Sequence, residues 1–493
     1  MSDTQGLLLL LSALRALAPL ALALISLVAV PIISAERFGA PRQAATRARY
    51  LVVALLLLSG GAAFVAGAGV ASTLLIGELS INPSQPGRLL VALGGPIFAI
   101  IVAVGEGRRA GAMGQVALFG LAVIDLALAI PIGIAPIALL LIGGTSLAAL
   151  AAGGKEDAER ARAVFRDLRS AGVLITLTVV AELLRSAIPL SATDPAYATT
   201  ASLTAGVALS LSLIVLASIG AFPFHHRLVR IFDSLPIVGS LMVGVWIPAA
   251  ITLIIFSELS LLISAVSDPI GGAVLPILVV TGAFTMLFGG ISALLHDDVG
   301  EVLGFFAVGS SGWLALGLAA VIARPSTLAP HVLVIPATLV ISLFGIWRAA
   351  IRRRYDLVSL QDLTGWARHT SAIGLVLVGV IVAMIAVPGS ALWSARADVI
   401  GASGSVITIV VAVAGAVALV AAVLRVLLVG LSQKSRDVER TEVRRVTHPV
   451  TIAMLAGTIL IAGAAAGLIN VESAASELLR PAPEATVVPG DLP

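Results

Sequence analysis

The chain lacks cysteine and is poor in charge. None of its 493 residues is cysteine, which excludes disulfides, thiolate-held iron–sulfur clusters and thiol catalysis within this chain. Charged residues make up 12% of the sequence and hydrophobic residues 59%, with a mean hydropathy of +1.10. Because a soluble domain carries about 25% charged residues, we interpret the chain as a polytopic membrane protein.

The sequence also lacks a motif for a metal, a nucleotide or an organic cofactor. Of its six histidines only His225 and His226 are adjacent, and no glycine fingerprint lies beside a strand. No nucleophile–base set is recognisable, so we expect no cofactor and no active site within this chain. Any redox chemistry would then occur on a partner. The pI near 9.8 does not indicate nucleic-acid binding, because the basic residues fall in short loops between apolar runs.

Long apolar runs recur along the whole chain. Each is about 18–25 residues long, enough to cross roughly 30 Å of hydrocarbon. The sequence therefore predicts an all-α integral membrane protein of about fourteen transmembrane helices, near 16–34, 50–72, 88–104, 114–131, 133–153, 171–193, 201–222, 235–257, 270–295, 302–324, 328–347, 371–395, 405–430 and 448–470.

Loop charges alternate in step with these runs. Loops after odd-numbered runs, the ninth excepted, contain several Arg or Lys residues, whereas loops after even-numbered runs contain almost none. The positive-inside rule then predicts both termini on the outer side of a prokaryotic inner membrane. The first residues contain Asp3 and no Lys or Arg, so we expect a retained first span rather than a signal peptide. We expect surface helices at 155–170 and 431–447, and a poorly ordered tail at 471–493.

Three separated stretches carry a family resemblance. The first is Phe222-Pro223-Phe224-His225, followed by Asp233 and Pro236; the second spans 289–320, and the third spans 362–396. In this order they resemble the antiporter-like membrane subunits of respiratory complex I, of multisubunit cation/proton antiporters and of membrane-bound hydrogenases.

The resemblance implies a fold of two inverted five-helix repeats, each with one broken helix. The breaks would fall at Pro223 and at Pro388 with Gly389, where the sequence contains helix-weakening residues. The implied division is helices 1–3 in 1–112, a first repeat of helices 4–8 in 113–260, a second repeat of helices 9–12 (which helix 13 could complete) in 261–400, helices 13–14 in 401–470, and the tail in 471–493.

Several positions depart from the family pattern of buried relay residues. Two lysines of the family fall on Ser218 and Pro248, a histidine falls on Ser310, and the glutamate of the fifth span has no counterpart in 126–154. The lysine that ends the twelfth span becomes Arg396. Since Ser and Pro do not titrate and Arg keeps its proton, we expect the central proton relay to be largely lost.

Ionisable residues inside the runs are the remaining candidates for a proton path. Asp125 could carry a proton, or it could be a neutral carboxyl bonded to a neighbouring helix. Glu182 and Arg185 lie one turn apart, which favours a mutual ion pair. Arg425 lies close enough to a helix end to extend its guanidinium toward water.

Three further groups lie near helix ends. His225 and His226 could pass protons at the cytoplasmic mouth, although a histidine that orients the loop is the simpler interpretation. His331, early in its run, is a weaker relay candidate. The acidic loop of Asp297, Asp298 and Glu301 could collect protons or cations, or could be a solvated turn.

Three functions are compatible with these patterns. The first is a membrane subunit of a complex I-like, hydrogenase or antiporter assembly, with proton transport reduced or absent and with other membrane subunits and lipid as partners. The second is a structural subunit of such an assembly, packed through small residues. The third is a stand-alone secondary transporter, which would need a polar binding site that the sequence does not reveal.

Overall fold

The computed structural model describes residues 42–66, 74–76, 79–81, 85–105, 110–130, 134–152, 158–188, 200–264, 271–355, 359–402, 404–432 and 448–466. The expected first span at 16–34 and the tail at 471–493 lie outside these ranges, as does most of 431–447.

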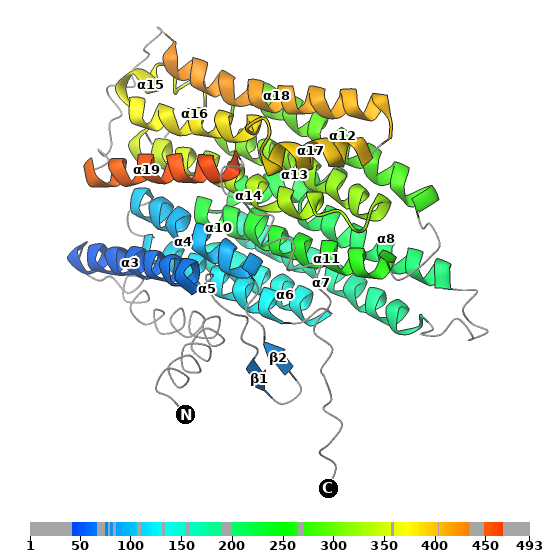
Figure 1. The fold of residues 1–493 in the computed structure, drawn as a ribbon. Coiled ribbons are helices and arrows are strands. Elements are labelled where there is room, and N and C mark those ends of the chain that lie inside the picture. Colours follow the sequence, from blue (N-terminus) through cyan, green and yellow to red (C-terminus); the bar gives the residue numbers. More distant parts are fainter. Residues whose placement is uncertain are drawn as a thin grey trace, which may run out of the picture.

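The described chain is a bundle of long helices with one short hairpin (Figure 1). Hydrophobic residues fill the helices on every face, which is the composition of a helix surrounded by protein or lipid. In chain order the elements are α3 (Arg42–Ala66), β1 (Leu74–Ile76), β2 (Leu79–Ile81), α4 (Gln85–Val104), α5 (Ala110–Ala129), α6 (Ile134–Ala152), α7 (Ala158–Ser186), α8 (Thr200–Ser218), α9 (His225–Ser234), α10 (Ile237–Leu241), a π-helical turn (Met242–Trp246), α11 (Ile247–Ser264), α12 (Gly271–Leu295), α13 (Val299–Ala323), α14 (Ala329–Tyr355), α15 (Trp366–His369), α16 (Ser371–Ile385), α17 (Ala391–Ala402), α18 (Val406–Leu431) and α19 (His448–Ala465).

The all-helical fold is confirmed, apart from the antiparallel hairpin of β1 and β2. Within the described ranges, eight segments are helical, long and apolar enough to cross a membrane. The chain is therefore an integral membrane protein. The number of about fourteen spans and the inverted repeats stay predictions.

The segment Ile237–Ser264 forms the centre of the bundle, since its most apolar window is 100% buried. The helices α13 and α14 are almost as deeply buried, whereas α12 and α18 expose more than half of theirs. In Figure 1, α18 accordingly lies along one edge of the bundle, with α16 beside it. The central segment contains a π-helical turn directly before Pro248, whose ring nitrogen cannot donate to the preceding turn.

Two predicted runs differ from the observed helices. The surface helix expected at 155–170 is continuous with the following span, because α7 runs without interruption from Ala158 to Ser186. The run expected at 371–395 is divided into α16 and α17. The first difference arises at a run boundary, which hydropathy alone defines poorly. The second lies inside the run, at the break expected at Pro388 and Gly389.

Candidate functional site

The first interruption lies between α8 and α9. α8 ends at Ser218, the chain reverses through Gly220 with φ +65°, and α9 begins at His225, so Pro223 lies in the connecting segment. Arg227 donates one guanidinium hydrogen bond to the Ser218 carbonyl at 3.0 Å and a second to Asp167 of α7 at 2.8 Å. The arginine thus closes the negative end of α8 and attaches it to a neighbouring helix.

We expect removal of the Asp167 carboxylate to destabilise this interruption. Asp167→Asn would weaken a mostly buried, charge-assisted hydrogen bond, at a cost of about 1–3 kcal/mol in the free energy of unfolding. Unfolding of the purified chain in detergent measures the difference. Asp233→Asn is the matched control, because Asp233 is exposed; an equal loss in both variants would contradict the expectation.

Two histidines begin α9, and the first of them packs against aromatic rings. His225 is buried and its ring lies 5.6 Å from that of Phe222 and 4.7 Å from that of Phe288, between centroids. Its Nδ1 has no hydrogen-bond partner within the described chain, and the exposed ring of His226 lies 4.0 Å away. The histidine pair therefore lies at the interruption, with one ring packed and the other accessible.

The second interruption lies between α16 and α17. α16 ends at Ile385, the chain turns through Ala386 (φ +56°) and Gly389 (φ +83°), and Pro388 is exposed between them. Arg396 of α17 donates to the Met384 carbonyl in the last turn of α16. Both interruptions therefore share one device, in which an arginine from the second helix segment binds the carbonyl end of the first.

This use of arginine recurs in the bundle. Arginines donate to carbonyls in the last turn of six helices, as Arg227 to α8, Arg396 to α16, Arg425 to α12, Arg348 to α9, Arg353 to α4 and Arg368 to α18. Each places a positive charge at the negative end of a helix dipole. Only Lys155 and Lys434 are lysines among the 30 basic residues, so nearly all the basic charge is permanent.

Polar side chains of α11 contact both α7 and α14. Arg185 lies 2.7 Å from Glu182 on its own helix and 3.6 Å from Glu258 of α11, so the predicted Glu182–Arg185 ion pair is confirmed. The neighbouring residue of α11, Ser257, lies 3.4 Å from Nε2 of the fully buried His331 on α14. Adjacent positions of α11 therefore contact two different helices, α7 and α14.

Sequence reasoning missed Glu258. Its run was expected to end at residue 257, which would have left this carboxylate in a loop. The structure extends α11 to Ser264 and buries Glu258 to 9% exposure. An acidic residue within Phe256-Ser257-Glu258-Leu259 was the available signal, because a carboxylate inside an apolar helix is costly and needs a partner.

Asp125 is buried, but it lies one turn before the end of α5 rather than near its middle. Arg88, near the start of α4, supplies a positive charge close to this carboxyl, while Oδ1 has no hydrogen-bond partner among the described residues. Asp125 therefore lies on a different helix from Arg185, Glu258 and His331.

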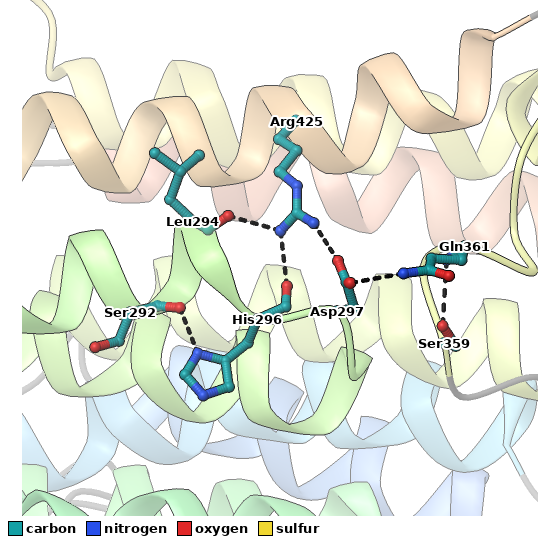
Figure 2. Close-up of polar contacts among 7 residues, drawn as sticks. All are labelled: Ser292, Leu294, His296, Asp297, Ser359, Gln361 and Arg425. Carbon is teal, nitrogen blue, oxygen red and sulfur yellow. Dashed lines mark hydrogen bonds and ion pairs between the residues drawn. The ribbon is translucent and has the colours of Figure 1, made fainter.

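The acidic loop after α12 is bound by its neighbours (Figure 2). Arg425 of α18 donates to the carbonyls of Leu294 and His296, each at 2.7 Å, and forms an ion pair with Asp297. Gln361 donates to the other Asp297 oxygen at 2.9 Å. This loop is a structural junction between α12, α18 and the segment before α15.

The remaining acidic residues of this loop have different environments. The Asp298 carboxylate accepts hydrogen bonds from the Gly300 and Glu301 backbone amides and so caps the start of α13. Glu301 lies 3.9 Å from His296. Asp298 is therefore a helix cap, distant in the chain from the other predicted proton-path residues.

The contacts of Asp297 predict that the stability of the fold decreases in acid. The hydrogen bond from Gln361, followed by that from Arg425, holds the pKa of Asp297 below its ordinary value. The carboxylate therefore stabilises the fold fully above about pH 4 and progressively less as pH falls through its lowered pKa. The melting temperatures of wild type and Asp297→Asn should differ at pH 6 and converge in acid; a constant difference would contradict this.

About half of the chain matches a known protein family. The family described as NADH:quinone oxidoreductase/Mrp antiporter, TM, matches residues 176–422, which include both helix interruptions. The chain belongs to this family. The resemblance found in the sequence is thereby confirmed.

Curated relatives of this family match over shorter regions. NADH-quinone oxidoreductase subunit N 1 of Opitutus terrae is 34% identical over 122 residues, which are 25% of this chain and 23% of the relative. NADH-quinone oxidoreductase subunit N of Laribacter hongkongensis is 24% identical over 185 residues, 37% of each chain. The chain thus aligns with less than two fifths of either relative.

Solved structures share the fold over nearly the whole length. A chain of the membrane-bound sulfane sulfur reductase, described as an archaeal respiratory membrane complex, superposes with a TM-score of 0.70 at 16% identity over 95% of this chain and 97% of its own. The Mrp complex from Dietzia sp. gives 0.69 at 16% identity, over 94% and 97%. Respiratory complex I from Thermus thermophilus gives 0.65 at 16% identity, over 94% and 98%.

The resemblance assigns four positions of this chain to relay residues of the family. Ser218 is buried at the end of α8, and its hydroxyl donates to the Val215 carbonyl at 2.9 Å. Pro248 lies in the buried centre of the bundle, after the π-helical turn. Ser310 and Arg396 line one cavity at the second interruption. None of these four side chains gains or loses a proton near neutral pH.

Proposed function

We propose that the chain is a membrane subunit of a complex I-like, hydrogenase or cation/proton antiporter assembly. In this proposal, proton passage through its two helix interruptions is reduced or absent. Other membrane subunits of the assembly and lipid are its partners. We place it in the inner membrane of a prokaryote with both termini on the outer side, with about fourteen spans in two inverted repeats.

The arginine at each interruption is the observation that supports reduced proton passage. Arg227 and Arg396 bind the open carbonyl ends of α8 and α16, and a guanidinium keeps its proton in proteins. A relay at an interrupted helix needs a group that titrates near neutral pH. Both points hold a permanent charge in hydrogen bonds to a helix end, and only the first also has side chains that titrate near neutral pH, those of His225 and His226.

A structural subunit of the same kind of assembly is the second candidate. Only 33% of the most apolar window of α18 and 44% of that of α12 are buried within this chain. These helices therefore present large apolar faces to lipid or to a neighbouring subunit.

A stand-alone transporter of organic solutes is less well supported. Cavities found between the described helices have volumes of about 60 Å³ and about 20 Å³. Sites for organic ligands of drug size are about 300–1,000 Å³. The observed spaces accommodate waters or small ions rather than an organic solute.

Affinity purification of the tagged chain in a mild detergent tests the proposal. We expect it to co-purify with quinone-reductase, hydrogenase or antiporter subunits in constant proportions through a second, size-based separation. Arg169→Gln, at an exposed position of α7, serves as a control that should recover the same set. Recovery of a lone, stable chain would contradict membership of an assembly.

A further inference from the structure

A small cavity adjoins the second helix interruption. Its volume is about 60 Å³, and its walls come from α13, α14, α16, α17 and α18. The lining is mostly apolar, with Pro336, Ala337 and Met384 among its members. Its polar side chains are Ser310, which is 6% exposed, the indole of Trp313 and the guanidinium of Arg396.

The charge of Arg396 is not balanced by a carboxylate. Among the residues that the structure describes, Arg227 and Arg425 each pair with an aspartate, but no Asp or Glu side chain lies within 4 Å of Arg396. Its contacts are the neutral Met384 carbonyl and the face of the Trp313 ring, 5.1 Å from the guanidinium carbon. Its buried Nε has no acceptor within the described chain.

An unbalanced cation of this kind is costly in a membrane-embedded site. Arginine does not relieve the cost by losing its proton, and a carbonyl with a π face compensates only part of a full charge. A bound anion would supply the missing negative charge and accept the free Nε–H. The Ser310 hydroxyl, in the same cavity, is a second donor that an anion could use.

We propose that this cavity binds a small monovalent inorganic anion, such as chloride, against Arg396. The volume admits about two water-sized particles, which suits one halide with a water and is too small for an organic acid of the size of gluconate. One permanent cation and one hydroxyl in an apolar wall match a single negative charge. A divalent anion would need more donors than the cavity contains.

The anion would stabilise the interruption between α16 and α17. It binds Arg396, which also closes the carbonyl end of α16, so occupancy and the geometry of the interruption are linked. The stability of the folded chain should then depend on the identity of the anion in solution. This inference is independent of the partners assigned to the chain.

Thermal unfolding of the purified full chain in detergent tests the site. Sodium chloride is compared with sodium gluconate at equal ionic strength, because gluconate is too large for the cavity. We expect the melting temperature of the wild type to rise by a few °C with chloride and to saturate. Bromide should act in the same way.

Two variants assign the effect to this cavity. Arg396→Gln removes the cation, and Ala337→Val fills space in the cavity while it retains Arg396, so the second remains informative if the first does not fold. Both should lose the saturable chloride effect, whereas Arg169→Gln should keep it. Stability that follows ionic strength alone, or a chloride effect that persists in Ala337→Val, would overturn the proposal in favour of a cavity holding only water.

Discussion

Gly289→Val is expected to cost about 3 kcal/mol in the free energy of unfolding, and to lower the yield of folded chain. A side-chain carbon at this position of α12 would lie too close to the Gly309 backbone of α13 and 2.9 Å from the Phe305 carbonyl. Backbone atoms cannot move aside as a flexible side chain can. The valine would therefore force α12 and α13 apart along their contact.

Gly172→Val is the matched control for this prediction. Gly172 lies on the exposed face of α7, where an added carbon meets no atom within 4 Å. Detergent unfolding of both variants measures the difference. Similar stability of the two valine variants would show that the α12–α13 contact tolerates separation.

Arg425→Ala is expected to destabilise the chain by about 2–3 kcal/mol. The change removes two hydrogen bonds to the carbonyl end of α12 and the ion pair with Asp297, as Figure 2 shows. The Leu294 and His296 carbonyls would lose their donor at a helix end. Because the guanidinium is partly exposed, water would replace some of the lost interaction.

Arg425→Lys tests whether the positive charge at this position is sufficient without the hydrogen-bond geometry of arginine. Arg169→Ala is the control. Lysine retains the positive charge but cannot reach both carbonyls and Asp297 with a planar fork, so we expect an intermediate loss. Arg169 is exposed, and its removal should change stability by less than about 0.5 kcal/mol. Equal unfolding free energies for wild type and Arg425→Ala would contradict the structural role of this arginine.

Hydropathy predicted the helices of the described chain well, because each apolar run is long compared with the uncertainty of its ends. It failed where the exact end of a run determined whether a charged residue is buried in a helix. The run ending at residue 257 excluded Glu258, although α11 continues to Ser264 and buries that carboxylate beside Arg185.

The arginine contacts could not be predicted from sequence. Loop charge indicated where Arg227, Arg396 and Arg425 lie along the chain, but hydrogen bonds to helix ends depend on which helices are neighbours. Arg425 illustrates the difference. We expected its side chain to extend toward water, and it instead joins α18 to the turn after α12.

Proton flux through the purified chain in liposomes tests the central claim most directly. With a potassium diffusion potential and an internal pH dye, we predict that chain-containing liposomes take up protons no faster than protein-free liposomes. The assembly that co-purifies with the chain is measured in parallel as a second sample. A saturable, chain-dependent proton flux that decreases in Asp125→Asn or Glu258→Gln would contradict the account, because it would show a working relay despite the arginine-bound helix interruptions.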